Sequence, residues 1–372
     1  MMEIKMRSLP HLVSALLLSA GVAACSSQPP LASGVALQRA ALSAQAAACT
    51  FQTWQANTTY TLGTTVLYPA NGRYYKLVNA TAGGSDKTDP TISTWYWQPT
   101  TCSGPSSGNK VLGTYYATFA PSAPRLREIH PNYTLIYLFA ATNAPGQPAG
   151  TLKFDPPPNG SGAWTNWTAD LQYVRSTQKR KVLLSVGGAG NAIRFTTRAV
   201  STTFVNSVDK LYQAWGGFDG LDFNTFEGDA APNTSEMIWI GQELKRRHPG
   251  FLITAPPAPW NTADQQFCKA MLTAGALDYC APQYYDGPQL NDPAYLQSNL
   301  QTWVNLLGAD HVVVGFGVNP GLANYWTIGS AVNTFSQANS RFPGLRGAFD
   351  WRLDWDVQQG SPFAQQFGPL TR

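Results

Sequence analysis

Eight short apolar runs recur along the C-terminal part of the chain, and this repetition constrains the fold more than any other feature. Helix-like patterns, such as those over 201–215 and 235–247, lie between the runs. Strands that alternate with helices build parallel sheets, and eight such units, over about 260 residues, can close into a barrel. We therefore expect an α/β fold, a (β/α)8 TIM barrel over residues 110–372, with strands at 111–117, 133–140, 181–186, 217–223, 251–255, 279–285, 311–317 and 344–351.

The fourth run contains a crowd of polar side chains, although charged residues make up only 12% of the chain. Residues 218–228 read F-D-G-L-D-F-N-T-F-E-G and include Asp219, Asp222, Asn224 and Glu227. Their alternation with Leu and Phe indicates a buried strand whose polar residues point into a site. Crowded, buried acids have raised pKa values, which lets a carboxyl group act as a general acid near neutral pH. The alternative is a strand end whose acids are solvated or cap a helix.

The N-terminus has the features of an export signal. A basic start with Lys5 and Arg7 precedes an apolar run that is too short to span a bilayer and ends in V-A-A-C at Cys25. The ending resembles a bacterial lipoprotein cleavage box, which implies removal of residues 1–24 and a lipid on Cys25. We expect an extracytoplasmic protein, anchored to a bacterial membrane by this lipid or secreted after an ordinary signal peptide.

The five cysteines agree with export. If Cys25 carries lipid, Cys49, Cys102, Cys268 and Cys280 remain, and three pairings are possible. Their separation along the chain favours Cys49 with Cys102 and Cys268 with Cys280, in an oxidising compartment. No spacing of Cys and His suggests a metal site, and we expect no metal and no cofactor.

Two segments with the composition of linkers, rich in Ser together with Gly or Pro, separate the parts of the chain that we expect to fold. Residues 25–48 have the composition of a tether, and 103–109 that of a linker. Between them, 49–102 is a small, aromatic unit of short strands with a predicted hairpin turn at Asn71 and Gly72. A disulfide across the ends would stabilise so small an all-β unit.

This small unit resembles the chitin-binding modules of carbohydrate-binding families 5 and 12. The residues that match are Trp54, Tyr60, Gly63, Val66, Gly72, Tyr75 and Trp97. Lys76, Leu77 and Val78 follow the hairpin tyrosine where family members often have an exposed tryptophan pair. Flat apolar rings stack against sugars, and the candidates for that role are Tyr74, Trp95 and Tyr96; the alternative is that such aromatic residues form the core.

The charge pattern excludes nucleic-acid binding. The net charge is +4, and basic residues are scattered along the chain. The tightest cluster, Lys179, Arg180 and Lys181, precedes an apolar run and is better explained by a solvated loop. We expect a monomer whose partners are carbohydrate and, through Cys25, a membrane.

The barrel region resembles glycoside hydrolase family 18, the chitinase family, over about 111–356. Five motifs occur in the family's order: L-L-S-V-G-G at 183–188, the acid-rich stretch at 219–227, T-A-P-P at 254–257, Q-Y-Y-D at 283–286 and G-A-F-D-W-R-L-D-W-D at 347–356. The resemblance implies a chitinase that hydrolyses β-1,4-linked N-acetylglucosamine polymers with retention of configuration. In the family's mechanism, a general acid protonates the glycosidic oxygen and the substrate's own acetamido oxygen attacks the anomeric carbon. The product is an oxazolinium ion, and the mechanism is an exception to the two-carboxylate scheme.

Residue roles follow from the matched motifs. Glu227 is the expected acid/base, with Asn224 and Asp222 beside it as orienting and stabilising groups. The resemblance also implies a hydrogen bond from Ser185 to the first acid, Asp219. Tyr285 would hold the acetamido carbonyl with Gln283 and Asp286 around it, and Trp351 would stack beneath the central sugar.

The acid-rich stretch departs from the family pattern twice. Asn224 stands where most members have Asp, and one extra residue separates it from Glu227. A bulge at Thr225 and Phe226 would return Glu227 to the face of Asp222. Two alternatives to a chitinase therefore stay open: a weakly active or inactive chitin-binding barrel, and an endo-β-N-acetylglucosaminidase that acts on glycoprotein glycans.

Overall fold

The computed structural model describes residues 52–68, 73–80, 85–92, 94–100, 110–120, 122–156, 164–225 and 231–372. The expected signal segment, tether, linker and the Cys49–Cys102 pair lie outside these residues. Within the described part of the chain, no helix has the length and apolarity that crossing a membrane requires.

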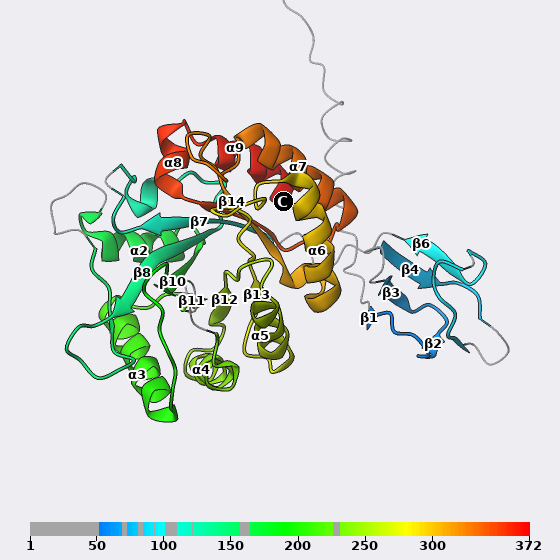
Figure 1. Ribbon diagram of the computed structural model, residues 1–372, viewed down its shortest axis with the longest axis horizontal. Helices are drawn as coiled ribbons and strands as arrows, with labels where there is room; N and C mark the ends of the chain where they lie inside the picture. Colours follow the sequence, from blue (N-terminus) through cyan, green and yellow to red (C-terminus); the bar gives the residue numbers. More distant parts are fainter. Residues whose placement is uncertain are drawn as a thin grey trace, which may run out of the picture. The chain divides into compact units, whose positions relative to one another are not determined.

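Eight parallel strands form the main sheet between 110 and 372, which confirms the predicted barrel (Figure 1). Their order is β13-β12-β11-β10-β8-β7-β15-β14, and the parallel bridges Cys280–Val312 and Gln283–Gly315 join its two ends. A short antiparallel strand, β9 (Leu152–Lys153), extends β8. The eight strands lie within or close to the predicted runs: β7 (Val111–Ala117), β8 (Leu135–Asn143), β10 (Lys181–Gly187), β11 (Gly220–Asn224), β12 (Leu252–Ala255), β13 (Tyr279–Cys280), β14 (Val313–Gly317) and β15 (Gly347–Trp351).

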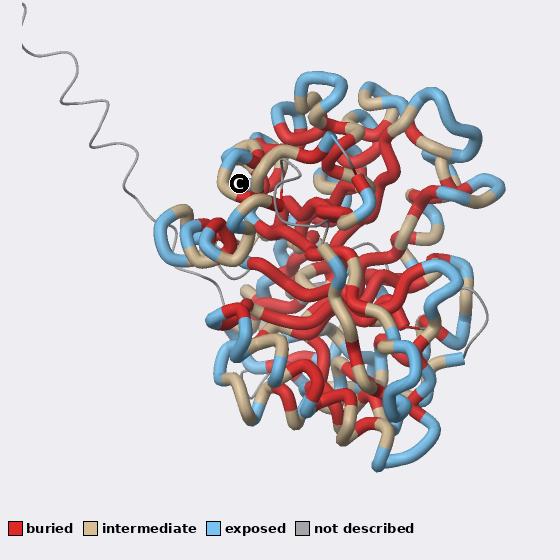
Figure 2. The backbone as a smooth tube through the Cα atoms, turned by 90° about the vertical axis from the view of Figure 1, so that its left-hand side faces the viewer, coloured by how far each residue is buried: buried red, intermediate tan, exposed pale blue. Residues whose placement is uncertain are grey.

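Helices surround the strands and bury them on the outer side (Figures 1 and 2). Five of them begin at a Thr, Asn or Asp whose side chain accepts a hydrogen bond from a first-turn backbone N–H, so local sequence defines where each starts. The helices are α2 (Trp167–Ser176), α3 (Arg198–Ala214), α4 (Thr234–Arg247), α5 (Thr262–Thr273), α6 (Pro293–Leu307), α7 (Ile328–Arg341), α8 (Leu353–Gln358) and α9 (Pro362–Phe367).

Aromatic rings fill the inside of the barrel. Tyr115 stacks on Tyr137 with centroids 4.5 Å apart, and the Tyr137 and Tyr279 hydroxyls are 3.0 Å apart. Glycine leaves room for them: a Cβ on Gly315 would lie 2.3 Å from Cζ of Phe349. The interior is therefore packed below the point where the strands end, and an open site can form only at the ends.

A disulfide joins Cys268 in α5 to Cys280 in β13. This is the pairing that the separation of the cysteines favoured. Both residues are fully buried, so the bridge links the helix layer to the strand layer inside the core.

Four of the strands between 52 and 100 form a small sheet in the order β1-β3-β4-β6, and β2 pairs separately with β5. The antiparallel β3–β4 pair agrees with the predicted hairpin, whose turn residues lie outside the described part. Its core consists of Tyr60, Val66, Tyr75, Leu77 and Trp97. The strands are β1 (Gln52–Thr53), β2 (Tyr60–Thr61), β3 (Thr65–Tyr68), β4 (Arg73–Leu77), β5 (Ser85–Asp86) and β6 (Trp97–Thr100).

Candidate active site

Asp222 is a fully buried carboxyl group inside the barrel, on β11. It accepts three side-chain hydrogen bonds, from Tyr115 Oη at 2.9 Å, Ser185 Oγ at 2.8 Å and Thr254 Oγ1 at 2.7 Å. Burial raises the pKa of Asp222 to about 6, because the charged form loses its solvent, while the three hydrogen bonds hold that pKa down. The carboxyl group can therefore gain or lose a proton close to neutral pH.

Desolvation is the leading cause of the raised pKa of Asp222, and no carboxylate among the described residues is a cause of the shift. The predicted crowding with Glu227 falls outside the described residues and stays a prediction. The three hydrogen-bonding partners of Asp222 are all uncharged hydroxyl groups. A site of this kind favours the neutral acid without a charged neighbour.

Asp219 does not lie with Asp222, and the expectation of a Ser185–Asp219 hydrogen bond is wrong. Asp219 precedes β11, and its carboxylate accepts from Arg175 Nε at 2.9 Å, Lys181 Nζ at 3.4 Å and the Val182 amide at 3.0 Å. The register pairs Ser185 with Asp222 instead. Because the two acids are three residues apart, they occupy different faces and ends of the strand. Asp219 joins a strand to a helix and takes no part in the site.

The basic cluster at 179–181 is not simply a solvated loop. Arg180 is buried and donates from Nη1 to the Ile129 carbonyl at 2.8 Å. Lys181 opens β10 and pairs with Asp219. Both side chains have structural partners at the ends of the strands, and neither forms a basic surface.

Asn224 is the next inward residue of β11 after Asp222. Its side chain is only 3% exposed, and its Oδ1 has no hydrogen-bond partner among the described residues. A buried, unused acceptor costs free energy, so it is a feature that a bound N–H donor would satisfy. Glu227 and the predicted bulge partner Phe226 lie outside the described residues.

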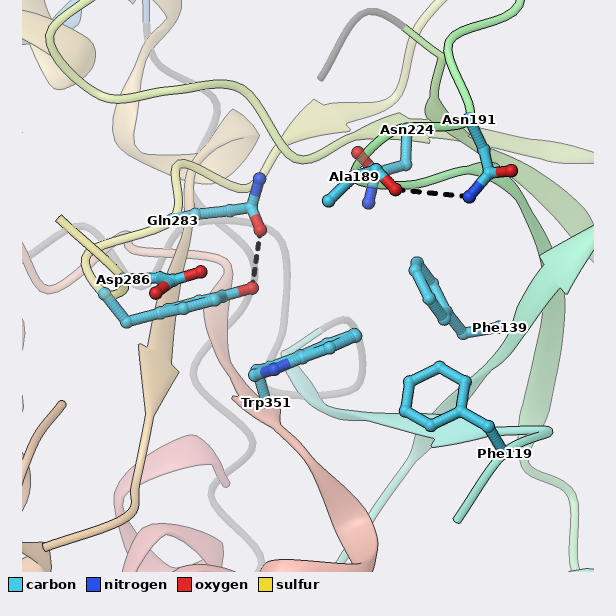
Figure 3. A pocket seen from close by; sticks show the side chains of 9 residues that line it. Phe119, Phe139, Ala189, Asn191, Asn224, Gln283, Asp286 and Trp351 are labelled. Carbon is cyan, nitrogen blue, oxygen red and sulfur yellow. Dashed lines mark hydrogen bonds between the residues drawn. The ribbon is translucent and has the colours of Figure 1, made fainter. Parts of the chain in front are cut away.

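A pocket of about 210 Å³ opens beside Asn224 at the ends of the strands (Figure 3). Polar groups lie on one side of it and aromatic rings on the other. Such a mixture suits a sugar, which has apolar faces and polar edges. The lining residues are Phe119, Phe139, Ala189, Asn191, Asn224, Gln283, Tyr285, Asp286 and Trp351.

Two flat rings line this pocket, those of Tyr285 and of Trp351, the latter labelled in Figure 3. Their rings are inclined by only 8°, with centroids 6.4 Å apart. Trp351 is held edge-on by Phe139 at 4.9 Å and by Tyr115 at 5.4 Å. Its orientation is therefore determined by packing before any ligand binds.

The Q-Y-Y-D segment supplies the polar side of the pocket. Tyr285 Oη donates to Gln283 Oε1 at 2.6 Å, and Gln283 Nε2 donates to the Pro256 carbonyl at 2.7 Å. Asp286 is exposed and has a left-handed backbone, with φ of 60°. The predicted residues Gln283, Tyr285, Asp286, Trp351 and Asn224 thus meet in one place.

Sequence reasoning missed Phe119, Phe139, Ala189 and Asn191 in the pocket, and Tyr115 and Thr254 at Asp222. Phe139 lies at the end of the predicted strand 133–140, and Ala189 follows the predicted strand 181–186. Their position at strand ends is the signal that could have identified them. Thr254 was part of a recognised motif without an assigned role. In the described part of the chain, no cluster of His, Cys, Asp or Glu has the arrangement of a metal site.

In the small unit, Tyr74 lies on the central strand β4 and is not part of the core formed by Tyr60, Val66, Tyr75, Leu77 and Trp97, so its role in stacking stays a prediction. Trp95 is 59% exposed, and its ring meets that of Tyr96 edge-on at 4.7 Å. All three residues are candidates for stacking.

The fold and pocket together define a (β/α)8 barrel with a carbohydrate-type pocket at the ends of its strands. The structure is similar to a family 18 chitinase from Chromobacterium violaceum, with a TM-score of 0.58 and 20% identity, over 87% of this chain and 100% of that one. It is also similar to a xylanase-α-amylase inhibitor protein, with a TM-score of 0.55 and 17% identity, over 69% and 98% of the two chains. The barrel is thus shared by an enzyme and an inhibitor, and only the site can decide function.

Two curated relatives are chitinases. Chitinase Chi52 of Paenibacillus xylanexedens is 31% identical over 172 residues, 41% of this chain and 31% of its own length. Chitinase D of Niallia circulans is 28% identical over 247 residues, 61% of this chain and 44% of its own. This chain therefore spans less than half the length of either relative. No family model matches the chain.

Proposed function

We propose that this chain is a chitinase that hydrolyses β-1,4-linked N-acetylglucosamine polymers with retention, by substrate-assisted catalysis. The observation that supports this most is Asn224, which lines the pocket together with Tyr285 and Trp351 and whose buried Oδ1 has no hydrogen-bond partner among the described residues. An acetamido group needs a hydrogen-bond acceptor for its N–H and a donor for its carbonyl. Asn224 and Tyr285 offer these two groups in one pocket.

In this mechanism, Glu227 protonates the glycosidic oxygen while the acetamido oxygen attacks the anomeric carbon. Asn224 accepts the acetamido N–H. Tyr285, whose hydroxyl donates to Gln283 Oε1 in the free protein, exchanges that bond for one to the acetamido carbonyl. The bond to the leaving sugar breaks, and a bicyclic oxazolinium ion forms. Water then opens the ion with Glu227 as the base, and configuration is retained.

In this mechanism, Asp222 stabilises the oxazolinium ion by its negative charge and forms no covalent bond to the substrate. With a pKa of about 6, it is mostly ionised at neutral pH and presents a negative charge one inward position from Asn224. Electrostatic stabilisation of a developing cation is strong in a site without water. Asp222 thereby compensates for the carboxylate that Asn224 does not supply. Trp351 and Phe139 cover the apolar side and exclude water from the ion.

The direct test is release of soluble N-acetylglucosamine products from colloidal chitin by the wild type and by Glu227→Gln. We expect release by the wild type and a loss of on the order of a hundredfold or more in the variant. Equal activity of the two proteins would rule out Glu227 as the acid. Release of glycans from a glycoprotein, with chitin untouched, would favour the endo-β-N-acetylglucosaminidase alternative.

A second candidate function is a chitin-binding protein that no longer cleaves. Asn224 itself favours it, because an amide stabilises a cation less than a carboxylate does. The similarity to an inhibitor protein with the same fold agrees with this reading. Retention on chitin without hydrolysis between pH 4 and pH 9, a range that brackets the pKa of about 6 at Asp222, would select it.

The N-terminal part adds a proposal about location. We propose export of the chain, anchorage through a lipid on Cys25, and binding of residues 49–102 to chitin through Trp95 and Tyr96. The support is the exposed indole of Trp95 and the signal-like sequence before Cys25. Radiolabelled palmitate incorporation by the wild type and Cys25→Ala tests the anchor, since only the wild type should be labelled.

A further inference from the structure

The loop that follows β12 contains three buried proline residues, Pro256, Pro257 and Pro259, and is called the proline loop below (256–259). Proline has no N–H and a fixed φ, so these residues offer only carbonyl oxygens, and the directions of those carbonyls are restricted. Gln283 donates from Nε2 to the Pro256 carbonyl at 2.7 Å and from its backbone to the Pro257 carbonyl at 3.1 Å. The proline loop therefore determines where Gln283, a residue that lines the pocket, lies.

The orientation of the Gln283 amide in turn determines where the Tyr285 hydroxyl points. Because Nε2 of Gln283 is bound to the Pro256 carbonyl, Oε1 is turned toward Tyr285, whose hydroxyl donates to it at 2.6 Å. In the proposed mechanism this hydroxyl exchanges its bond to Gln283 for one to the acetamido carbonyl, so Gln283 determines the position from which it starts. A misplacement of about 1 Å in a site can cost on the order of a hundredfold in rate.

Asn299, a partly buried residue of α6, connects the proline loop to the segment that carries Tyr285. Its Nδ2 donates to the Pro259 carbonyl at 3.1 Å, and its Oδ1 accepts from the Tyr284 hydroxyl at 2.9 Å. Tyr284 is fully buried and directly precedes Tyr285, so the backbone between the two tyrosines joins the helix layer to the pocket. Both polar atoms of one amide thus hold the two pieces of chain that position Gln283 and Tyr285.

Other contacts fix the proline loop to the helices and leave Asn299 its separate role. The Pro259 carbonyl also accepts from Gln265 Nε2 at 3.1 Å and from Trp303 Nε1 at 3.2 Å. The Ala258 amide donates to buried Asp264 at 3.0 Å. These bonds anchor the loop to α5 and α6, whereas the bond from Tyr284 makes Asn299 a link between the loop and the pocket segment.

We propose that Asn299 is a positioning residue for the reaction: it holds the proline loop and Tyr284 together, so that the Tyr285 hydroxyl starts in the position from which it reaches the acetamido carbonyl. Asn299 does not line the pocket and touches neither the substrate nor the reacting atoms. This inference rests on the proposed function, because that function assigns the acetamido contact to Tyr285.

The test is a double-mutant cycle between Asn299 and Tyr285, with kcat and KM measured on a soluble N-acetylglucosamine tetramer. In the wild-type background, Asn299→Ala is expected to lower kcat on the order of tenfold, because the Tyr285 hydroxyl is misplaced. In a Tyr285→Phe background, which lacks that hydroxyl, the same substitution should lower kcat by less than about twofold. A residue that supports only the fold would cause the same loss in both backgrounds.

Two further variants separate the link from a general effect on α6. Tyr284→Phe removes only the hydroxyl that Asn299 accepts, so it should cause part of the same loss, again only where the Tyr285 hydroxyl is present. Gln297→Ala is the matched control, because Gln297 is an amide of the same helix whose Nε2 donates to the Thr334 carbonyl of α7 at 2.9 Å. It should change kcat in neither background.

Three outcomes would overturn the proposal while the proposed function stands: an unchanged kcat in Asn299→Ala, an equal loss in the two backgrounds, or an equal loss in Gln297→Ala. If the wild type releases no product from the tetramer, the proposed function and this inference fail together. Thermal unfolding of each variant confirms folding at the assay temperature. If Asn299→Ala does not fold, Tyr284→Phe, which loses a single oxygen atom, decides the question in the same two backgrounds.

Discussion

Asp222 and Ser185 are register partners on neighbouring strands, and the Ser185 hydroxyl donates to Asp222 Oδ2 at 2.8 Å. Removing that donor should raise the pKa of Asp222, since the bond favours the ionised form. For Ser185→Ala, we expect the acidic limb of the kcat/KM profile to move up by about half to one pH unit. Ser201→Ala, at a buried serine whose hydrogen-bond partners are the Thr197 carbonyl and Glu236, is the control. An unmoved limb would mean that Asp222 does not limit activity.

Asp222 should also make stability depend on pH. Its pKa is raised from 3.8 to about 6 on folding, so the folded state binds the proton more tightly than the unfolded state. Stability from this group is present at low pH and is lost as pH rises through about 4 to 6, by about 3 kcal/mol in all. Asp222→Asn removes the titrating carboxyl group and with it this pH-dependent loss of stability. The free energy of unfolding of the variant, relative to wild type, should therefore rise by up to that amount between pH 4 and pH 7, as urea titrations measure; a constant difference would contradict the shift.

Substitutions of Asn224 test the effect of having an amide where most members of the family have a carboxylate. Asn224→Asp supplies a negative charge where the oxazolinium ion would form, and we expect kcat on a short oligomer to rise on the order of tenfold. Asn224→Ala removes the acetamido acceptor and should lower kcat by at least that factor. If alanine leaves kcat unchanged, Asn224 does not orient the substrate.

The Cys268–Cys280 bridge closes a loop with a sequence separation of 12 residues. Such a bridge restricts the unfolded chain and contributes about 3 kcal/mol. Cys268→Ala with Cys280→Ala should lower the unfolding free energy by about that amount without changing the pocket. Differential scanning calorimetry measures the change, and a Tm equal to that of the wild type would show that the bridge does not stabilise the fold.

Trp95 and Trp97 should behave differently when each is replaced by Ala. Trp95 is 59% exposed, so its loss should reduce retention on colloidal chitin and leave stability almost unchanged. Trp97 is fully buried in the core of the small unit, and its loss should cost about 3 kcal/mol of packing. Pull-down at 4 °C and thermal unfolding separate the two effects. Full retention by Trp95→Ala would exclude it from chitin binding.

The sequence alone determined the architecture. Each barrel strand is an apolar run bounded by polar or helical residues, and buried parallel strands require such runs on both faces. It also identified five residues that meet at the pocket, because motifs at strand ends converge wherever parallel strands share an edge. The disulfide at Cys268 followed from chain separation.

The tertiary structure decided which side chains touch. A period of two assigns faces but not the register between strands, so only the fold could pair Ser185 with Asp222 and leave Asp219 to Arg175 and Lys181. Asn224 and Trp351 lie on β11 and β15, which are opposite each other in the ring and far apart in sequence, and closure of the barrel is the physical reason that they border one pocket.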